Sequence, residues 1–351
     1  MAPPSRLEGF REGRGWGRIP PVLLYGGANY AESNMKKLYK YYPSSFDLAK
    51  YLKDPTIKIS QLQHLNDPFE GMLTGEALGI LIKKIQPILL PEATKKISDI
   101  LYTKKHIKRQ ISSLGITSLS ETSRNLLMWS HYASEHKGFC IGYKIPLIKP
   151  YKNKMINPPV LRKVNYDSLL FDHEHIEFLN TINDDLDLAI GKTVDRILTT
   201  KSESWSYEKE HRYITNIEQC DVIRFFKDKK MNPKYILEAV SKAIRDDSHD
   251  VIEDSDKIEL TSKRTTSQLI HAISDPQSIE MRMKESRNTL FLKRIPVKNI
   301  DSIYFGVNFS KYIIEEIIDF KNSNKELSTI NLYHYELSNE RYEIIPYSLK
   351  E

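Results

Sequence analysis

The sequence predicts an α+β protein with a mixed or antiparallel central sheet and peripheral helices. Segments with the two-residue alternation of strands are interspersed with segments of helical periodicity, and no regular strand–helix–strand rhythm repeats along the chain. A hydrophobic fraction of 40% and a charged fraction of 28% are ordinary for a globular protein, and 351 residues are enough to bury a substantial core. The chain has no internal repeats, which argues against a solenoid.

Two strands and a short helix are predicted at the start of the folded region. Residues 38–42 are rich in tyrosine and are followed by Pro43, so we expect a strand that ends there. Ser44 or Ser45 is then placed to cap a short helix that runs through Lys53. The alternation over residues 56–60 predicts the second strand.

The rest of the chain continues this irregular alternation. Pro91 suits the first turn of a helix, and Leu186, Ile190, Val194 and Ile197 recur at the spacing of an amphipathic helix. The remaining predicted helices cover residues 68–85, 91–113, 125–135, 184–198, 233–244 and 312–321. The remaining predicted strands cover residues 115–120, 139–143, 211–215, 289–295, 302–307 and 329–337.

Two stretches differ from this pattern. Residues 1–34 hold six of the 14 glycines and show no sustained periodicity, which indicates a flexible leader before a single α+β domain over 35–351. Residues 228–287 are charged and weakly periodic apart from one helix. We expect them to form an insertion with a mobile part.

Composition excludes several classes of protein. No apolar run approaches the roughly 18–20 residues that cross a bilayer, so we expect no membrane segment. Cys140 and Cys220 have neither disulfide-framework nor metal-type spacing, which favours a cytoplasmic protein without a metal site. The net charge of +6 is mild, because nucleic-acid domains usually concentrate positive charge more strongly.

Positive charge is nevertheless concentrated between Lys95 and Arg109. Lys105 and Arg109 are four residues apart in a predicted helix, so part of this cluster shares one face. Two interpretations stay open: a solvated helix surface, or a basic face that contacts nucleic acid or another polyanion in a salt-sensitive manner.

The first motif with chemical content is Asn66–Glu70, directly after the second strand. Asp67 can cap the helix that Pro68 begins, which would make the motif structural. Alternatively, the sharp turn presents Asn66 or Glu70 at the edge of a cleft, where strand-to-helix turns often place site residues.

The second motif is Met128–Gly138, on a helix that runs into a strand. Trp129 and Tyr132 are three residues apart, so one helix face can line a pocket. His131 is a candidate proton carrier, or a hydrogen-bonded packing residue. We expect Gly138 to occupy the C-terminal cap of the helix.

The third motif, Trp205–Arg212, is the most informative. If it is extended, Glu208, Glu210 and Arg212 share one face and Trp205 lies on the other. The stacked carboxylates require a nearby cation, and Arg212 is the local candidate. The motif is either an ion pair that braces the sheet, or a carboxylate site that binds a sugar hydroxyl and stabilises an oxocarbenium charge.

In combination, these motifs resemble a known bacterial family, domain of unknown function 2971, over roughly residues 36–310. The chain departs from the family pattern in its leader, in the 228–287 stretch and at Tyr42, where a basic residue is more usual. The resemblance rests on the ordered series Leu38–Tyr41, Asn66–Glu70, Met128–Ala133, Lys137–Phe139, Lys201 with Trp205–Arg212, and Ile303–Gly306.

More loosely, the chain is similar to ADP-ribosyltransferase-like proteins. The shared features are an early aromatic strand, a serine-containing strand (Thr117–Ser120) and a late Glu-x-Glu. The resemblance implies a split sheet that binds NAD as substrate, with Glu210 acting on the nicotinamide ribose and Glu208 on the acceptor side. Ser118 or Ser120 would support the pocket. The Arg or His of the first motif is absent, and Lys40 or Tyr39 would take its place.

Three functions follow as hypotheses. The first is an enzyme that transfers a glycosyl or ADP-ribosyl group from NAD or another nucleotide, in phage defence or as a toxin. The second is a nuclease or nucleic-acid-binding protein that uses Lys95–Arg109. The third is a ligand sensor or interaction module without catalysis. The predicted catalytic residues are Glu210, Glu208 and His131. The predicted substrate-binding residues are Tyr39, Lys40, Asn66, Glu70, Ser118, Ser120, Trp129, Tyr132, Trp205 and Arg212.

Overall fold

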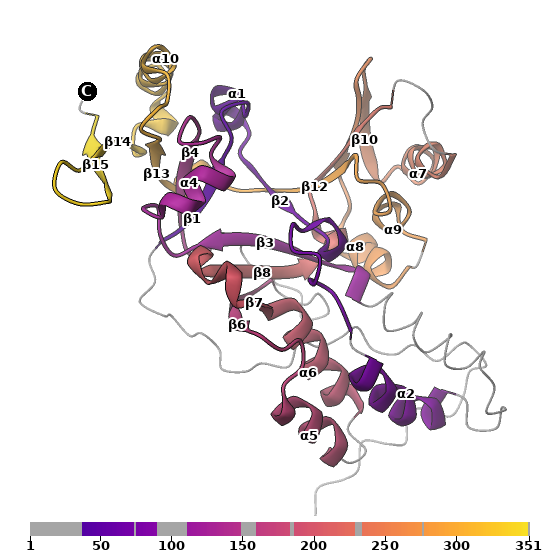
Figure 1. The fold of residues 1–351 in the computed structure, drawn as a ribbon. Coiled ribbons are helices and arrows are strands. Elements are labelled where there is room, and N and C mark those ends of the chain that lie inside the picture. Colours follow the sequence, from indigo (N-terminus) through magenta and orange to yellow (C-terminus); the bar gives the residue numbers. More distant parts are fainter. Residues whose placement is uncertain are drawn as a thin grey trace, which may run out of the picture.

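The computed structural model of the protein describes residues 37–73, 75–89, 111–148, 159–182, 186–228, 234–275 and 277–349. It is an α+β protein with a large mixed sheet and peripheral helices, as the sequence predicts (Figure 1). The expected leader and the basic Lys95–Arg109 face lie outside the described residues.

The main sheet of the described chain has eight strands in the order β15-β14-β13-β4-β1-β3-β8-β5. Among its described strands, β13 and β14 pair in parallel and the other neighbours are antiparallel. The strands are β1 (Lys37–Tyr42), β3 (Leu114–Ser120), β4 (Phe139–Lys144), β5 (Val160–Lys163), β8 (Glu210–Asn216), β13 (Ile300–Phe305), β14 (Asn331–Leu337) and β15 (Ile344–Ser348).

This sheet opens between β1 and β3. Register along β1 and β4 runs without a break from Lys37 to Tyr42, whereas β1 and β3 are in register only where Tyr39 faces Ser120. The two strands therefore diverge, and Figure 1 shows β3 and β8 crossing the centre of the molecule at an angle to β1 and β4. The divergence leaves room for side chains from both strands to line a pocket.

A second sheet of the described chain has five antiparallel strands in the order β10-β11-β9-β12-β2. A short bridge joins it to the main sheet, because Ser60 and Ile116 exchange backbone hydrogen bonds of 2.7 Å. Its strands are β2 (Thr56–Ile59), β9 (Val222–Phe226), β10 (His249–Glu253), β11 (Lys257–Ser262) and β12 (Thr289–Arg294).

The charged 228–287 stretch builds much of this second unit. It supplies β10 and β11, which weak periodicity did not predict, and three helices. The apolar face of α7, with Ile236, Ala239 and Val240, packs on buried residues of β9 and β11. The helices are α7 (Lys234–Arg245), α8 (Thr266–Ser274) and α9 (Ile279–Met283).

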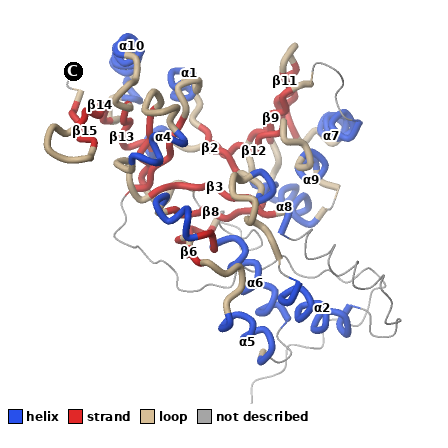
Figure 2. The backbone as a smooth tube through the Cα atoms, viewed as in Figure 1, coloured by secondary structure: helices blue, strands red, loops and turns tan. Residues whose placement is uncertain are grey.

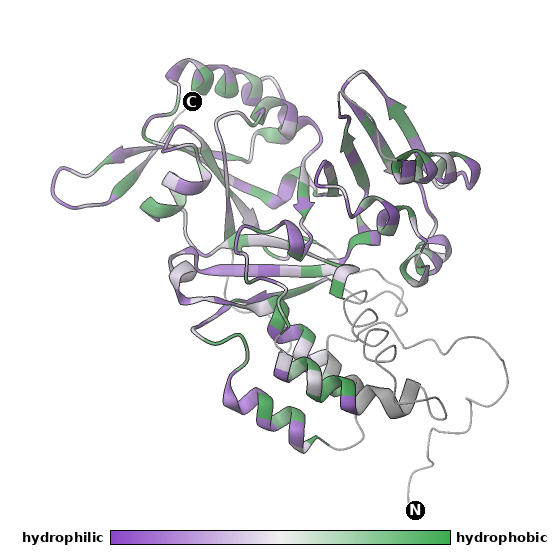
Figure 3. Ribbon diagram, turned by 45° about the vertical axis from the view of Figure 1, so that its right-hand side comes forward, coloured by the Kyte–Doolittle hydropathy of each residue, from purple (hydrophilic) through white to green (hydrophobic). Residues whose placement is uncertain are grey.

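A helical layer lies beneath β3 and β8, formed by α2 (Gly75–Leu89), α5 (His173–Thr181) and α6 (Leu186–Thr199) (Figures 1 and 2). Helix α6 confirms the predicted amphipathic segment. Figure 3 shows the helices banded in green and purple, as expected when one face is buried. A parallel pair, β6 (Asn165–Asp167) and β7 (Thr200–Ser202), connects this layer to the main sheet.

Several predicted helix boundaries are wrong. The helix expected over 68–85 begins only at Gly75, because residues 68–71 form a turn in which Gly71 has a φ of +79°. Helix α1 (Leu48–Lys53) is capped by Asp47, which accepts from the Lys50 amide at 2.9 Å, and not by Ser44 or Ser45. Helix α4 (Leu126–Tyr132) is shorter than predicted, whereas α10 (Lys311–Asn322) matches its prediction closely.

The predicted role of Gly138 is also wrong. The left-handed turn that follows α4 is made by Ser134, Glu135 and His136, with φ of 46°, 53° and 68°. Gly138 is needed instead for close packing, because a Cβ there would lie 2.2 Å from the Tyr42 carbonyl oxygen. The chain reversal from α4 into β4 therefore depends on the close approach of Gly138 to the backbone of Tyr42.

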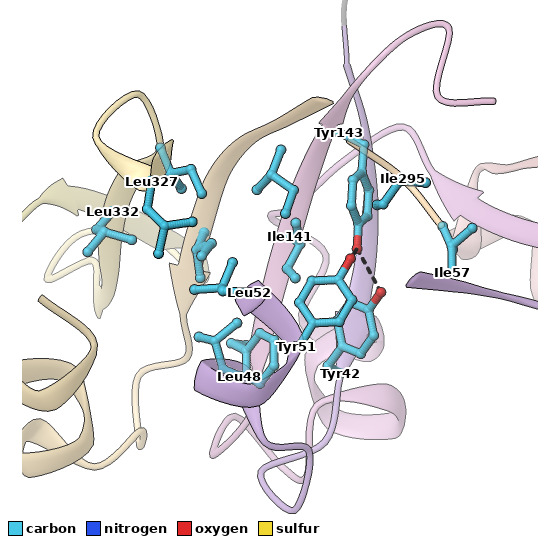
Figure 4. Close-up of a cluster of buried hydrophobic side chains, with 14 of the residues drawn as sticks. Tyr42, Leu48, Tyr51, Leu52, Ile57, Ile141, Tyr143, Ile295, Leu327 and Leu332 are labelled. Atoms are coloured by element: carbon cyan, nitrogen blue, oxygen red, sulfur yellow. Dashed lines mark hydrogen bonds between the residues drawn. The ribbon is translucent and has the colours of Figure 1, made fainter. Parts of the chain in front are cut away.

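The largest apolar cluster packs α1 and α10 against the main sheet. At its edge Tyr42, Tyr51 and Tyr143 join their hydroxyl groups, with O···O distances of 2.7 Å from Tyr143 to Tyr42 and 2.8 Å from Tyr143 to Tyr51 (Figure 4). Burial raises the pKa of all three phenols, so they remain neutral hydrogen-bonding groups. The three tyrosines thereby link α1 to β1 and β4.

Candidate functional site

A pocket of about 260 Å³ lies where β1 and β3 diverge, and we call it the β1–β3 pocket. Strands β1 and β3, the segment from β2 to the turn before α2, helix α4 and the start of β8 all contribute to its wall. The predicted site residues that line it are Tyr39, Lys40, Asn66, Glu70, Ser118, Ser120, Tyr132, Glu208 and Glu210.

A buried cluster of five charged side chains forms one wall of the pocket and its support. Arg212 holds Glu210 through two hydrogen bonds of 2.9 Å and also donates to Glu70 at 2.9 Å. Lys201 lies 2.7 Å from Glu208, 3.3 Å from Glu70 and 3.5 Å from Glu210. None of these side chains is more than 6% exposed. Such burial is tolerated only because each charge is paired.

The local backbone brings the two late carboxylates together in an unexpected way. Residues Glu203–Glu208 form a 3₁₀ helix (η2), and Lys209 adopts a left-handed conformation with a φ of 45° before β8 begins at Glu210. The extended conformation considered for Trp205–Arg212 is therefore found only from Glu210 onward. Within β8, however, Glu210 and Arg212 do share one face, as the strand period requires.

The cluster controls the protonation of its members. Burial raises the pKa of Glu210, but Arg212, Lys201 and a hydrogen bond from Ser118 outweigh burial, so the pKa lies below its usual value. Burial also raises the pKa of Glu70, and here the two cations only partly offset it. Burial lowers the pKa of Lys201, yet the three carboxylates reverse this effect and raise it overall. Glu210 is accordingly ionised at neutral pH.

Glu208 is held from two directions. The Tyr132 hydroxyl donates to its Oε1 at 2.6 Å, and Lys201 donates to its Oε2 at 2.7 Å. Burial and the neighbouring Glu208 carboxylate raise the pKa of Tyr132, which keeps the phenol protonated as a donor. The Ser120 hydroxyl fixes the backbone by donating to the Glu208 carbonyl at 2.7 Å. The carboxylate orientation is thus set by α4, β3 and β7.

Two lysines line another part of the pocket. Lys40 donates to the Ser118 carbonyl at 3.1 Å, across the opening between β1 and β3. Burial, with the like charge of Lys58, lowers the pKa of Lys40 to about 8, although Glu210 opposes the shift. Burial also lowers the pKa of Lys58. Neither ammonium group forms an ion pair with a carboxylate within the described residues.

Four predicted site residues lie outside the pocket lining. Trp129 is fully buried in the core, where its Nε1 donates to the Ser123 carbonyl at 2.8 Å. His131 is exposed and its ring contacts that of Tyr207. Trp205 covers the charged cluster, with its ring 4.7 Å from Lys201 Nζ. Arg212 lies beneath the lining and supports it.

Lys58 and Lys201 both line the pocket, although neither was a predicted site residue. Lys58 lies in a short alternating strand, and nothing in the neighbouring sequence indicates that it lines a pocket. Lys201 appears in the family pattern seven residues before Glu208, and that spacing was the available clue. Its reach to the carboxylates depends on the η2 turn, which periodicity does not reveal.

The chain was compared with known proteins and structures. Residues 128–213 match the family described as "Protein of unknown function (DUF2971)". This confirms the predicted resemblance over the segment from α4 to β8, which contains Tyr132, Lys201, Glu208, Glu210 and Arg212. Neither the curated proteins nor the solved structures gave a significant match.

No group of three or more His, Cys, Asp or Glu side chains in the described chain is arranged to hold a metal ion. No described helix combines the length and the apolar character needed to cross a membrane.

Proposed function

We propose that the β1–β3 pocket binds a nucleotide, with NAD as the leading candidate, and that the protein transfers its glycosyl or ADP-ribosyl group. The observation that carries the proposal is the charge of one wall. Glu70, Glu208 and Glu210 surround Lys201 and Arg212, so three negative charges meet two positive ones. Taken by itself, this wall holds one carboxylate more than it holds cations, and carboxylates placed there would stabilise a sugar cation.

The two lysines support the same assignment. Lys40 and Lys58 have no carboxylate partner within the described residues, which leaves both ammonium groups available to an anion. A ligand with a phosphate at one end and a sugar at the other would match lysines in one part of the wall and carboxylates in another. A pocket of about 260 Å³ suits a nucleoside-sized portion of such a ligand.

The proposed step breaks the C–N glycosidic bond. Its electron pair leaves with the base nitrogen, and positive charge develops on the sugar C1′ and ring oxygen. The ionised Glu210 would bind a ribose hydroxyl and stabilise that charge. Glu208 would take the proton of the acceptor as its nucleophilic atom bonds to C1′. Tyr132 and Lys201 hold Glu208 in place for this role.

The direct test is to incubate the full chain with NAD, and separately with other nucleotides, and to measure base release and modified products by mass spectrometry. We expect turnover by the natural protein and a loss of about 10²- to 10³-fold in Glu210→Gln. Glu203→Gln, an exposed carboxylate on η2, is the matched control and should keep full activity. The variants can also be expressed in bacteria. Growth arrest by the active variants alone would support a role as a toxin or in phage defence.

Because Glu210→Gln also removes a partner of Arg212, the fold of each variant must be verified by circular dichroism and urea unfolding. Lys40→Met disrupts no ion pair within the described residues and should weaken nucleotide binding while the fold is retained. If intact nucleotide binds but is never turned over, the pocket belongs to a ligand sensor. If the folded natural protein binds no nucleotide, the proposal is wrong.

A further inference from the structure

A second pocket, of about 400 Å³, lies behind the charged wall of the first. It is formed between the turn before α2 and the segment that connects β6 to α5. Glu70 and Lys201 line both pockets, so this ion pair stands between them. The other lining residues that matter here are Asp67, Phe69, Asp167 and Leu169.

Two carboxylate oxygens in the wall of the second pocket lack partners. Asp67 is 3% exposed, and its Oδ1 accepts from the Phe69 amide at 2.9 Å, but its buried Oδ2 has no hydrogen-bond partner within the described residues. The Glu70 side chain is 2% exposed, and its Oε2 is likewise buried without a partner there. A buried carboxylate oxygen normally accepts a hydrogen bond. The two unpartnered oxygens therefore indicate a ligand that supplies hydrogen-bond donors.

The charge and the rim of this pocket define the ligand further. Asp67, Glu70 and Asp167 outnumber Lys201, which is shared with the carboxylates of the first pocket. Asp167 is already paired with Arg196 at 3.0 Å and Glu70 with Arg212 at 2.9 Å, so within the described residues Asp67 holds the unmatched negative charge. The rim is apolar, with Phe69 54% and Leu169 56% exposed. A cationic nitrogen group on an apolar stem satisfies both features.

We propose that the second pocket binds a guanidinium or ammonium group carried on an apolar chain. Asp67 and Glu70 accept hydrogen bonds from the nitrogen group, while Phe69 and Leu169 contact the chain. The proposal does not depend on the reaction assigned to the β1–β3 pocket. Glu70 lines both pockets, but Asp67, Phe69 and Leu169 line only the second. A free small amine and an arginine or lysine side chain of another protein share this chemistry.

The test compares two ligands of the same shape by calorimetric titration of the full chain. Butylguanidinium carries the positive charge, and butylurea replaces it with a neutral group. We expect the cation to bind at least tenfold more tightly. In Asp67→Asn this preference should fall at least tenfold, since the amide keeps an oxygen for the Phe69 amide but exchanges the unpartnered oxygen for a donor. Glu174→Gln, an exposed position on α5, should leave the titration unchanged.

Leu169→Ser provides a second variant that leaves the buried carboxylates intact, and it should weaken butylguanidinium binding several-fold. A capped tripeptide with arginine at its centre distinguishes the sources, because tighter binding than that of butylguanidinium identifies a protein side chain.

Equal binding of the two butyl ligands, or an unchanged preference in a folded Asp67→Asn, would overturn the proposal. Loss of NAD turnover in Glu210→Gln with normal butylguanidinium binding would separate the two sites.

Discussion

Arg212 Nη2 lies 2.9 Å from Glu70 Oε1 and so joins β8 to the turn before α2, across 142 positions of sequence. Both side chains are almost fully buried. The same guanidinium holds Glu210 through two further bonds and donates to the Leu198 carbonyl at 2.7 Å. One residue therefore fixes the carboxylate wall, the end of α6 and the second pocket relative to one another.

Replacing this guanidinium should strongly destabilise the fold. Arg212→Met leaves Glu70 and Glu210 buried with Lys201 as their remaining cation, and breaking such a buried network costs about 3–5 kcal/mol. Urea unfolding followed by fluorescence measures the difference. Arg341→Met, at an exposed position, is the control and should change stability by less than about 0.5 kcal/mol. A similarly small effect for Arg212→Met would contradict the network.

Lys40 should make stability rise with pH. Its pKa falls from 10.5 in the unfolded chain to about 8 in the fold. Between these values the unfolded state binds more protons, so stability increases as pH rises from about 8 to about 10.5. Unfolding free energies of the natural protein and Lys40→Met, compared over this range, should diverge in favour of the natural protein. Parallel pH profiles would show that Lys40 is not desolvated.

Glu218 should make stability fall as pH rises, which is the opposite of the effect of Lys40. It is 1% exposed, and its Oε2 has no hydrogen-bond partner in the described chain. Burial and then the like charge of Glu280 raise its pKa from 4.5 to about 8. Its contribution to stability is fully present below pH 4.5 and is lost as pH rises through about 8.

Glu218→Gln should therefore become more stable relative to the natural protein as pH increases from 5.5 to 8.5. The slope for one proton is at most about 1.4 kcal/mol per pH unit. Urea unfolding at intervals across this range gives the profile. Glu203→Gln, which removes an exposed carboxylate, should give a flat difference, and a flat profile for Glu218→Gln as well would exclude the expected protonation.

Gly138 should tolerate no side chain. A Cβ there would lie 2.2 Å from the Tyr42 carbonyl oxygen and 2.9 Å from that of Ala133. Both obstacles are backbone atoms, so we expect Gly138→Ala to cost more than about 2 kcal/mol. Gly79→Ala is the matched control in α2, where a Cβ meets nothing within 4 Å and alanine should stabilise by about 0.5–1 kcal/mol. Thermal unfolding of both variants provides the comparison.

Much of the fold could be predicted because its signals are local. The tyrosine-rich β1, the alternating β2 and the apolar spacing of α6 each reveal their structure within a few residues. Strands β10 and β11 were missed because they lie in a charged stretch. The alternate residues Ile258 and Leu260 of β11 are buried with residues of α7, which packs on the second sheet. Periodicity could not identify this partner in advance.

The sequence by itself determined the fold class, most strands and the residue types of the candidate site, because periodicity and composition act over short spans. Tertiary structure alone decided which charges meet. It placed Glu70 beside Arg212, turned Glu208 toward Tyr132 through η2, and opened the sheet so that Lys40 and Lys58 share a pocket with the carboxylates. Trp129, with the same local signal as Tyr132, became core. Long-range contacts depend on chain geometry summed over the whole fold, which a short motif does not encode.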